Sequence, residues 1–432
     1  MSLARRLAHR ADAGEPKKKK LRKPPLRKPP LRNKAARTRP TGQEGFVRDA
    51  VDVPVGARQR RPAAVAKDLA GLELPTAPAL ADALADLAVM PRAGLDPEVP
   101  AVMIDLETTG LMGQSGALVC VVGAAWHVAP DCLHFEQWSL HRVGAEGAML
   151  ADIDATLRDR VGPRTSFVSF NGASFDLPLL RRRMIRHAIY RATEDPLRAP
   201  HVDLLHPARR LWRDRGPDCR LGTLEARQLA MHREGDVGGA EVVELLWRWL
   251  EEPDEAAAAD LAKVQRHNRI DVLSLTALAH TMHRRLADPV DDVERLRAAR
   301  HHHRLERMPA AVALLEPLLA RLARSTTPGK GWETPVGAGL LAAEIERRAG
   351  RHDLAARYWA QVCRRVPGHP EAHEALAKHL EHKARAPAAA LAVASASVTP
   401  CERRVARLRK KVADGPVPPV VEVVSTWAQP RV

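Results

Sequence analysis

Apolar positions in the middle of the chain change from strand-like runs to helical spacing. Four apolar residues open a strand at Ala101–Asp105, and Ala117–Trp126 is a continuous apolar run of sheet length. His134–Leu140 alternates between apolar and polar residues, as a third strand does. Because these strands follow one another closely, they are predicted to form an antiparallel meander.

Beyond the meander, the pattern predicts alternating helices and strands. A helix is expected over Ala148–Val161, then a buried strand at Phe167–Phe170 and a helix over Phe175–His187. Further amphipathic helices are expected at Arg220–Leu229, Glu241–Leu250 and Asp260–Leu286. The order predicts an α/β fold, in which a mixed sheet of an antiparallel meander plus parallel strands is flanked by helices.

The flanking segments differ in composition and divide the chain into further regions. Residues 1–45 repeat LRKPP in tandem and are predicted to be a disordered basic, Pro-rich tail. Residues 46–99 are interpreted as a linker or lead-in with one short Ala/Leu-rich helix, ended by Pro91. Residues 100–287 form the predicted α/β domain, followed by a helical region at 288–400 and a partly disordered tail at 401–432.

The helical region contains a weak internal repeat. Leu341, Ile345, Glu346 and Ala355 recur 35 positions later as Leu376, Leu380, Glu381 and Ala390. This offset is close to the tetratricopeptide period of about 34 residues. Such helical stacks bind protein or cover the apolar face of a domain, so a protein partner is one expectation for this region.

Charge is concentrated at the N-terminus. The net charge is +16, and residues 1–40 hold 15 Lys and Arg against Asp12 and Glu15, which leaves 53 basic and 50 acidic residues elsewhere. A tail of this kind binds nucleic acid non-specifically, or it only keeps the protein in solution.

Cysteines and hydropathy favour a cytoplasmic protein. The five cysteines include no CxxC pair, which argues against a disulfide framework or a zinc module. No apolar run reaches the roughly 18–20 residues of a membrane span, so no membrane contact is expected.

Asp105 and Glu107 end the first strand of the meander. Residues i and i+2 of a strand point to one face, so both carboxylates leave the same side of the strand beside a turn. Two anions held this close are costly without a cation, and an oxygen-rich site favours Mg²⁺ or Mn²⁺. The alternative is a solvated acidic pair at a strand end.

Two later segments carry compatible residues. SFNGASFDLPLL places Asn171 and Asp176 after an apolar run, and QRHNRIDVLSL places His267 and Asp271 one turn apart on a helix. Four carboxylates in three segments suit a phosphodiesterase in which two metals clamp the attacking water and the leaving oxygen. The alternative for Asp176 is an acid that the helix dipole favours.

At these residues the chain resembles the DEDD group of 3′–5′ exonucleases, which share an RNase H-like fold, and more closely the YprB-type RNase H-like family of bacteria. The likeness runs through IDLETTGLMGQSGALVCVVGAAW, FNGASFDLPLLRRR, HVDLLHPARRLWR, CRLGTLEARQL and HNRIDVLSL, from about Val102 to Leu286. It implies a metal-dependent 3′–5′ exonuclease that uses two Mg²⁺ or Mn²⁺ ions on single-stranded DNA or RNA.

The resemblance also implies roles for individual residues. Asp105, Glu107, Asp176 and Asp271 would hold the metals, with Asp105 as the bridging ligand. His267 would be the general base, although its three-residue spacer is that of the family's tyrosine class; otherwise it binds phosphate, or it packs while Asn268 contacts substrate. Thr108, Thr109 and Leu111 would meet the terminal nucleotide through backbone donors and an apolar wedge. Asn171 would contact substrate or fix its loop.

Other polar and aromatic residues have weaker interpretations. His201 and Asp203 form an HxD pair that is expected to cap a helix or line a substrate groove rather than bind metal. Trp247 and Trp249 are expected to pack rather than stack on bases. The rival to an enzyme is a nucleic-acid-binding module that acts as a scaffold through its helical repeats.

Overall fold

The computed structural model describes residues 45–56, 61–87, 101–110, 116–160, 165–191, 195–324, 331–413 and 415–429. The statements below concern these residues. Most of the predicted basic tail, residues 1–44, and the predicted substrate contact Leu111 lie outside them.

A six-stranded mixed sheet forms the centre of the fold, with strand order β1-β4-β3-β2-β5-β6. The pairs β1–β4, β4–β3 and β3–β2 are antiparallel, whereas β2–β5 and β5–β6 are parallel. The strands are β1 (Phe46–Pro54), β2 (Val102–Thr108), β3 (Val119–Ala129), β4 (Cys132–Leu140), β5 (Phe167–Ser169) and β6 (His201–Asp203). The predicted meander and the parallel extension are therefore both confirmed.

Strand β1 lies in the segment that the sequence predicted as a linker. It pairs with β4 from Phe46 to Pro54 and forms one edge of the sheet. Arg48 on this strand binds Glu136 at 2.8 Å and Asp152 at 3.1 Å. An edge strand with several exposed polar residues has no strong apolar pattern, which explains why the sequence did not predict it.

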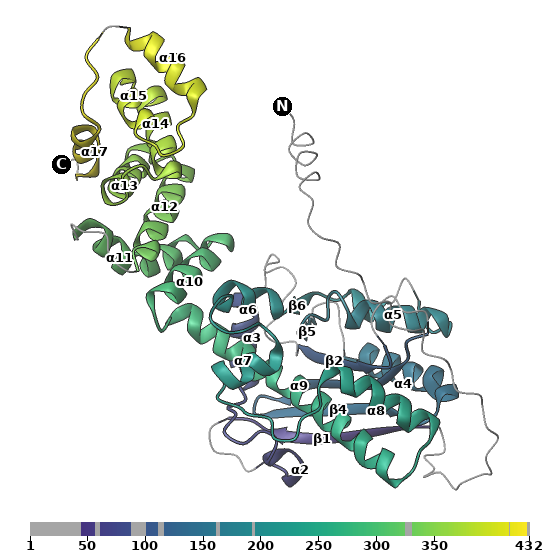
Figure 1. Cartoon of the computed structure of the whole chain (residues 1–432). Helices are drawn as coiled ribbons and strands as arrows, with labels where there is room; N and C mark the ends of the chain where they lie inside the picture. The colour runs from purple at the N-terminus through teal and green to yellow at the C-terminus, as the bar shows by residue number, and fades with distance from the viewer. Residues whose placement is uncertain are drawn as a thin grey trace. The chain divides into compact units, whose positions relative to one another are not determined.

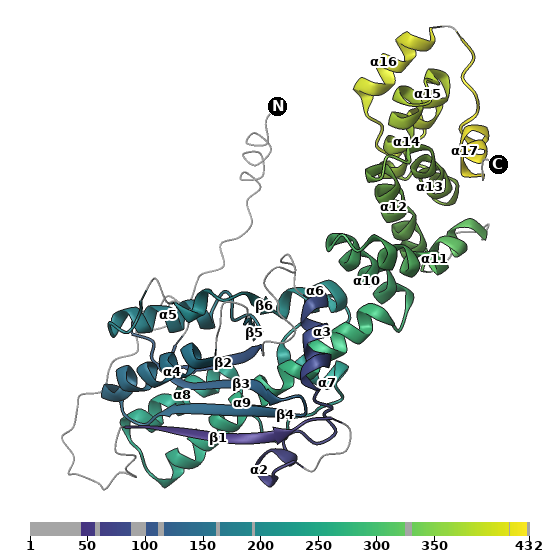
Figure 2. The ribbon, with the colours of Figure 1, turned by 180° about the vertical axis from the view of Figure 1, so that it is seen from behind.

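The two faces of β2 point into different cores. Ile104 packs in one core with Met149 and Leu150 of α4 (Glu146–Arg160), whereas Met103 packs in the other with Ile270 of α9 (Glu255–Ala287). Figures 1 and 2 show α4 and α9 on opposite faces of the sheet. Because strand side chains alternate, Asp105 and Glu107 share the Met103 face and point toward α9.

Helices account for most of the remaining described chain. The early ones are α2 (Ala63–Ala66), α3 (Ala77–Leu87), α5 (Asp176–Arg186), α6 (Leu205–Trp212), α7 (Leu221–Gln228) and α8 (Gly239–Glu251), with 3₁₀ turns at Val143–Ala145 and Pro196–Arg198. Trp249 of α8 is 3% exposed and donates its indole N–H to the Leu140 carbonyl, which confirms its predicted packing role.

The C-terminal region is helical, as predicted. Its helices are α10 (Asp292–Arg304), α11 (Met308–Arg324), α12 (Glu333–Arg348), α13 (His352–Arg365), α14 (Pro370–His382), α15 (Pro387–Ser395), α16 (Glu402–Val412) and α17 (Val420–Ala428). The last two fall in the segment expected to be partly disordered, and α17 packs against α13. The tetratricopeptide character of these helices stays a prediction.

The described helices also differ from membrane-spanning segments, which need about 20 consecutive, mostly apolar residues. No described helix combines the length and the apolar character that crossing a bilayer requires.

Candidate metal centre

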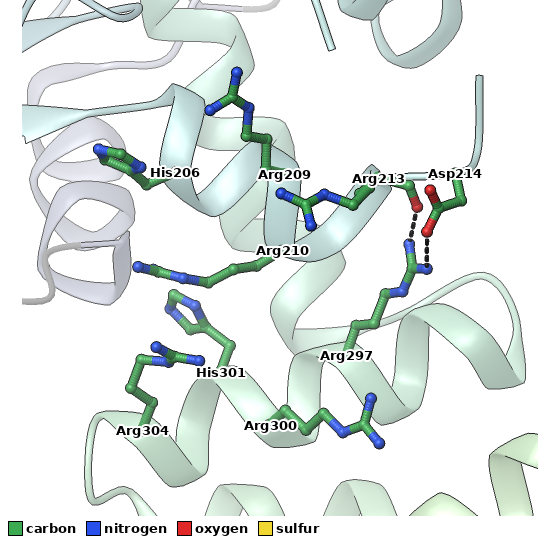
Figure 3. Close-up of a pocket in the computed structure, with 9 residues that line it drawn as sticks. All are labelled: His206, Arg209, Arg210, Arg213, Asp214, Arg297, Arg300, His301 and Arg304. Atoms are coloured by element: carbon green, nitrogen blue, oxygen red, sulfur yellow. Dashed lines mark hydrogen bonds and ion pairs between the residues drawn. The ribbon is translucent and has the colours of Figure 1, made fainter. Parts of the chain in front are cut away.

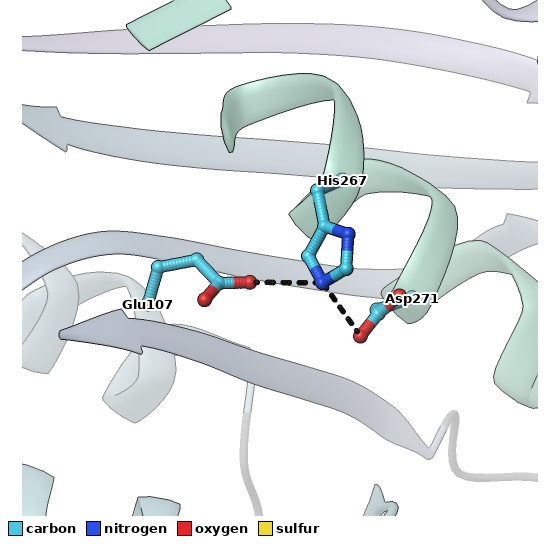
Figure 4. A group of neighbouring side chains, drawn as sticks. All are labelled: Glu107, His267 and Asp271. Atoms are coloured by element: carbon cyan, nitrogen blue, oxygen red, sulfur yellow. Dashed lines mark ion pairs between the residues drawn. The ribbon is translucent and has the colours of Figure 1, made fainter. Parts of the chain in front are cut away.

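Three side chains from β2 and α9 form a compact group of possible metal ligands. One ligand atom from each of Glu107, His267 and Asp271 lies within 4.8 Å of the others. His267 Nε2 is 3.8 Å from a Glu107 oxygen and 3.7 Å from an Asp271 oxygen (Figure 4). Their side chains are only 12–16% exposed. The i,i+4 spacing on α9 therefore brings His267 and Asp271 to the same carboxylate of β2.

The other two predicted ligands, Asp105 and Asp176, lie in the same electrostatic environment. Burial raises the pKa of Asp105 well above its usual value, and the charges of Asp271, Glu107 and Asp176 raise it further. Burial likewise raises the pKa of Asp176 to about 7, with contributions from Asp203 and Asp271. All four predicted carboxylates thus repel one another, although the compact group in the described chain contains only Glu107 and Asp271.

His267 is held from behind by Asp236, in the loop before α8. Its Nδ1 lies 2.8 Å from an Asp236 oxygen. When the ring is neutral and Nδ1–H donates to Asp236, Nε2 carries a free lone pair on the side that faces Glu107 and Asp271. Burial alone would lower the pKa of His267, but Asp236, Asp271 and Glu107 together raise it to about 9. Without a metal, the imidazole is therefore charged at neutral pH.

Arg233 supplies a second buried cation, which the sequence did not reveal. Its guanidinium binds both oxygens of Glu225 at 2.6 Å, contacts Asp236 at 3.1 Å and forms an ion pair with Asp271. Glu225 is fully buried and accepts a hydrogen bond from Ser274. Burial lowers the pKa of Arg233, but Asp271 and Glu225 more than compensate. Arg233 lies in the Gly-containing loop between α7 and α8.

Asn268 has a different position from the substrate contact predicted for it. It is fully buried, and its amide N–H₂ donates to the Asp105 carbonyl at 3.1 Å and to the Asp105 carboxylate at 2.9 Å. Its carbonyl accepts from Gln137 at 2.9 Å. A Cβ atom on Gly123 would lie 2.3 Å from that carbonyl, so the close approach of Asn268 requires glycine. Asn268 therefore positions Asp105.

The turn after β2 also differs from the prediction. Thr109 is 4% exposed, and its N–H donates to the Leu118 carbonyl while its hydroxyl accepts from the Leu118 N–H. The backbone donor expected to meet a nucleotide is thus occupied. Thr108 donates its hydroxyl to the Gly110 carbonyl at 2.8 Å. Trp247 donates to the Thr109 carbonyl at 3.1 Å and remains 38% exposed, so it packs only in part.

Asp203 fixes the loop that precedes Asp176. Its carboxylate accepts from the backbone N–H groups of Asn171 at 2.7 Å, Ala173 at 3.2 Å and Leu205 at 3.0 Å. The expected helix-entry role of Asp203 is confirmed by the Leu205 contact. Asn171 has a left-handed φ of 69°, whereas the role of its side chain stays a prediction.

A close approach in this loop helps to set the position of Asp176. A Cβ atom on Gly172 would lie 2.5 Å from the Ser169 hydroxyl and 2.8 Å from an Asp176 carboxylate oxygen. Only glycine therefore lets the loop pass so close to both side chains. His201, the partner of Asp203 in the HxD pair, is 2.8 Å from the Ser169 hydroxyl, rather than in the compact group.

The donor set fits a divalent cation. Carboxylate oxygens are the preferred ligands of Mg²⁺ and Mn²⁺, and imidazole is a further ligand for transition metals. Burial raises the pKa of Glu107 to about 8; the charge of His267 opposes this shift, whereas those of Asp271 and Asp176 add to it. A bound cation would relieve that repulsion. The bound cation would share Asp271 with Arg233, which already forms an ion pair with that carboxylate.

Two comparisons with known proteins agree with the fold. Residues 102–283 match the model of the RNase H superfamily, so this part of the chain is an RNase H superfamily domain. A Bacillus subtilis (strain 168) protein described as "Uncharacterized protein YprB" is 29% identical over 331 residues, which cover 71% of this chain and 74% of that protein. The matched residues include β2 and most of α9, so the acidic group lies inside this domain.

Proposed function

We propose that this protein is a metal-dependent nuclease that shortens single-stranded DNA or RNA from the 3′ end. The observation that carries the proposal is the group of Glu107, His267 and Asp271, with ligand atoms within 4.8 Å of one another inside an RNase H superfamily domain. Asp105 and Asp176 add two partly buried carboxyls, and clustered anions of this kind have no stabilising role of their own.

Four carboxylates are proposed to hold the metals. Asp105 and Glu107 come from β2, Asp176 from the start of α5 and Asp271 from α9. Two Mg²⁺ or Mn²⁺ ions, when bound there, would stabilise the charge on the attacking and leaving oxygens of a phosphodiester. The protein contributes a rigid frame: Asn268 holds Asp105, and the Asp203 loop supports Asp176.

His267 is the proposed general base. Asp236 orients its Nδ1, so Nε2 points toward the group of Glu107 and Asp271 where a water molecule would be activated. The metal-free pKa of about 9 is too high for a base at neutral pH. Because two of the charges that raise it belong to proposed metal ligands, neutralising them returns the imidazole toward its unperturbed pKa.

A binding module is the second candidate, and Arg233 is the observation that favours it. Arg233 pairs with Asp271, so the protein already supplies a cation where a metal ligand is expected. In that case the same domain would hold nucleic acid without cleaving it. The two candidates differ in turnover rather than in binding.

Degradation of end-labelled strands tests the proposal. Single-stranded DNA and RNA labelled at the 5′ end are incubated with Mn²⁺ and wild type, Asp105→Ala or the control Asp159→Ala, which changes an exposed acid on α4. Stepwise shortening by wild type and the control, but not by Asp105→Ala, is the expected result. Internal cuts would indicate an endonuclease, and intact strands that still shift in a gel would favour the binding module.

A further inference from the structure

A strongly basic cavity of about 420 Å³ lies between α6 and α10. It is separate from the compact acidic group, with which it shares no residue. Figure 3 shows side chains from the two helices and the turn after α6 facing this space. The lining comprises six arginines, two histidines and one acid: His206, Arg209, Arg210, Arg213, Asp214, Arg297, Arg300, His301 and Arg304.

Most of this positive charge has no counterion in the described chain. Arg297 donates to the carbonyls of Leu211 and Arg213 and lies 3.6 Å from Asp214. The side chains of the other five arginines form no hydrogen bond or close ion pair with any described residue, although the negative charge of Glu371 acts on Arg300. The Nη1 atom of Arg210 is buried without a hydrogen-bond partner. Unpaired guanidinium groups gathered at one cavity favour an anion.

The helices that carry these arginines are firmly joined. Trp212 at the end of α6 donates its indole N–H to Glu294 of α10 at 2.7 Å, and Glu294 is 2% exposed. Arg215 forms an ion pair with Asp291 just before α10. His301, buried at the base of the cavity, contacts the Asp86 carbonyl at 2.9 Å. The backbone frame of the cavity is thus set before any ligand arrives.

The cavity is close to the acidic centre along the chain. Asp203, whose charge contributes to the raised pKa of Asp176, lies two residues before the start of α6. At 1.5 Å per residue, the arginines of α6 are on the order of 10 Å further along the helix axis. A strand bound at the acidic centre could therefore reach the cavity within a few nucleotides.

We propose that the α6–α10 cavity binds the phosphodiester backbone of the nucleic-acid strand, a few nucleotides away from the bond that is cleaved. The choice of nucleic acid rests on the proposed function. Even without Arg300, on which Glu371 acts, four unpaired arginines exceed the charge of one phosphate and suit consecutive phosphates. The lining contains no Phe, Tyr or Trp on which a base could stack, so the cavity contacts the backbone rather than the bases.

Equilibrium binding of the full chain in EDTA tests the proposal without requiring catalysis. The ligand is a labelled single strand of about 20 nucleotides, followed by fluorescence anisotropy over a range of NaCl concentrations. Arg209→Gln/Arg213→Gln removes two exposed arginines of the cavity. The matched control Arg347→Gln/Arg348→Gln removes two exposed arginines that pair with Glu344. Thermal unfolding checks that both variants fold.

The expected result is a change in salt dependence confined to the cavity variant. Losing two phosphate contacts on a single strand lowers the slope of log K against log salt by about 1.4. Arg209→Lys/Arg213→Lys should restore most of that slope, because lysine keeps the charge. Equal slopes for the Gln variant, the control and wild type would refute the proposal.

Further measurements distinguish a small phosphate from a nucleic-acid strand as the ligand, and failure of the backbone site from failure of the nuclease. If inorganic phosphate or a mononucleotide binds wild type through these arginines while strand binding is unaffected, the cavity is a small-phosphate site and the proposal is wrong. If the slope changes as expected but no strand is degraded with Mn²⁺, the nuclease fails and the backbone site stands. If the Gln variant degrades strands at the wild-type rate and its slope is unchanged, the backbone site fails and the nuclease stands.

Discussion

Binding of Mn²⁺ at the acidic centre is predicted to release protons. The pKa of Glu107 is raised to about 8, first by burial and then by Asp271 and Asp176, against the opposing charge of His267. Burial, Asp203 and Asp271 raise the pKa of Asp176 to about 7. A carboxyl has to be deprotonated to bind a cation, so each protonated group gives up its proton when the metal arrives.

The size of this effect follows from the two pKa values. At pH 7, a group with a pKa of about 8 is ~90% protonated and one with a pKa of about 7 is ~50% protonated, so these carboxyls release ~1.4 protons together. Asp105, whose pKa is also raised, adds to this number. For each proton released, the affinity for Mn²⁺ increases up to about tenfold when the pH rises by one unit.

Calorimetry measures the number of protons directly. Mn²⁺ is titrated at pH 7 in two buffers with different heats of ionisation, and the difference in binding heat gives the proton count. Glu107→Gln should lower the count by ~0.9 and weaken binding. The control Glu255→Gln, at an exposed position in the first turn of α9, should leave both unchanged. A wild-type affinity that is the same at pH 6 and pH 8 would refute the reasoning.

Three further predictions concern stability. In EDTA, protonated Glu107 contributes stability that is fully present below its ordinary pKa of 4.5 and is lost as pH rises through about 8. The melting temperature should therefore fall over this pH range, and Glu107→Gln should make the fall smaller. Gly123→Ala crowds Asn268 and should cost about 1–3 kcal/mol in urea unfolding, whereas Gly144→Ala, which meets no atom within 4 Å, should cost less. Asp203→Ala leaves three backbone donors without their acceptor and should lower the free energy of unfolding by about 1–3 kcal/mol. An unchanged urea midpoint for Gly123→Ala or for Asp203→Ala would contradict the corresponding estimate.

The sequence predicted those strands and helices whose own apolar pattern shows which side is buried. The apolar runs at 117–126 and 167–170 became β3 and β5 because buried strands need such runs. Strand β6 is as short as β5, but only Val202 of its three residues is apolar, so no apolar run marks it. Helix α17 lies in the tail that was expected to be partly disordered, but its Val423 and Val424 bury an apolar side against the C-terminal helices.

The acidic site was predictable where spacing determines direction. Asp105 and Glu107 share a face because they are two apart on a strand, and His267 and Asp271 because they are four apart on a helix. Asn268 was misassigned because neighbouring helical residues point about 100° apart. It faces the sheet while His267 faces the loop. Arg233 could not be predicted, since in sequence a buried arginine looks like a solvated one.

Charge balance connects the two sites. Two resident cations, Arg233 and His267, face the four carboxylates of the acidic centre and also pair with Glu225 and Asp236, which leaves an excess of four negative charges when all are ionised. The raised pKa values show that the metal-free protein meets this excess by retaining protons. Protons cannot also offset the charge of an incoming phosphate, whereas a divalent cation can. On the proposed function, the basic cavity therefore attracts a strand in either state, but only the metal-loaded centre admits the phosphate to be cleaved.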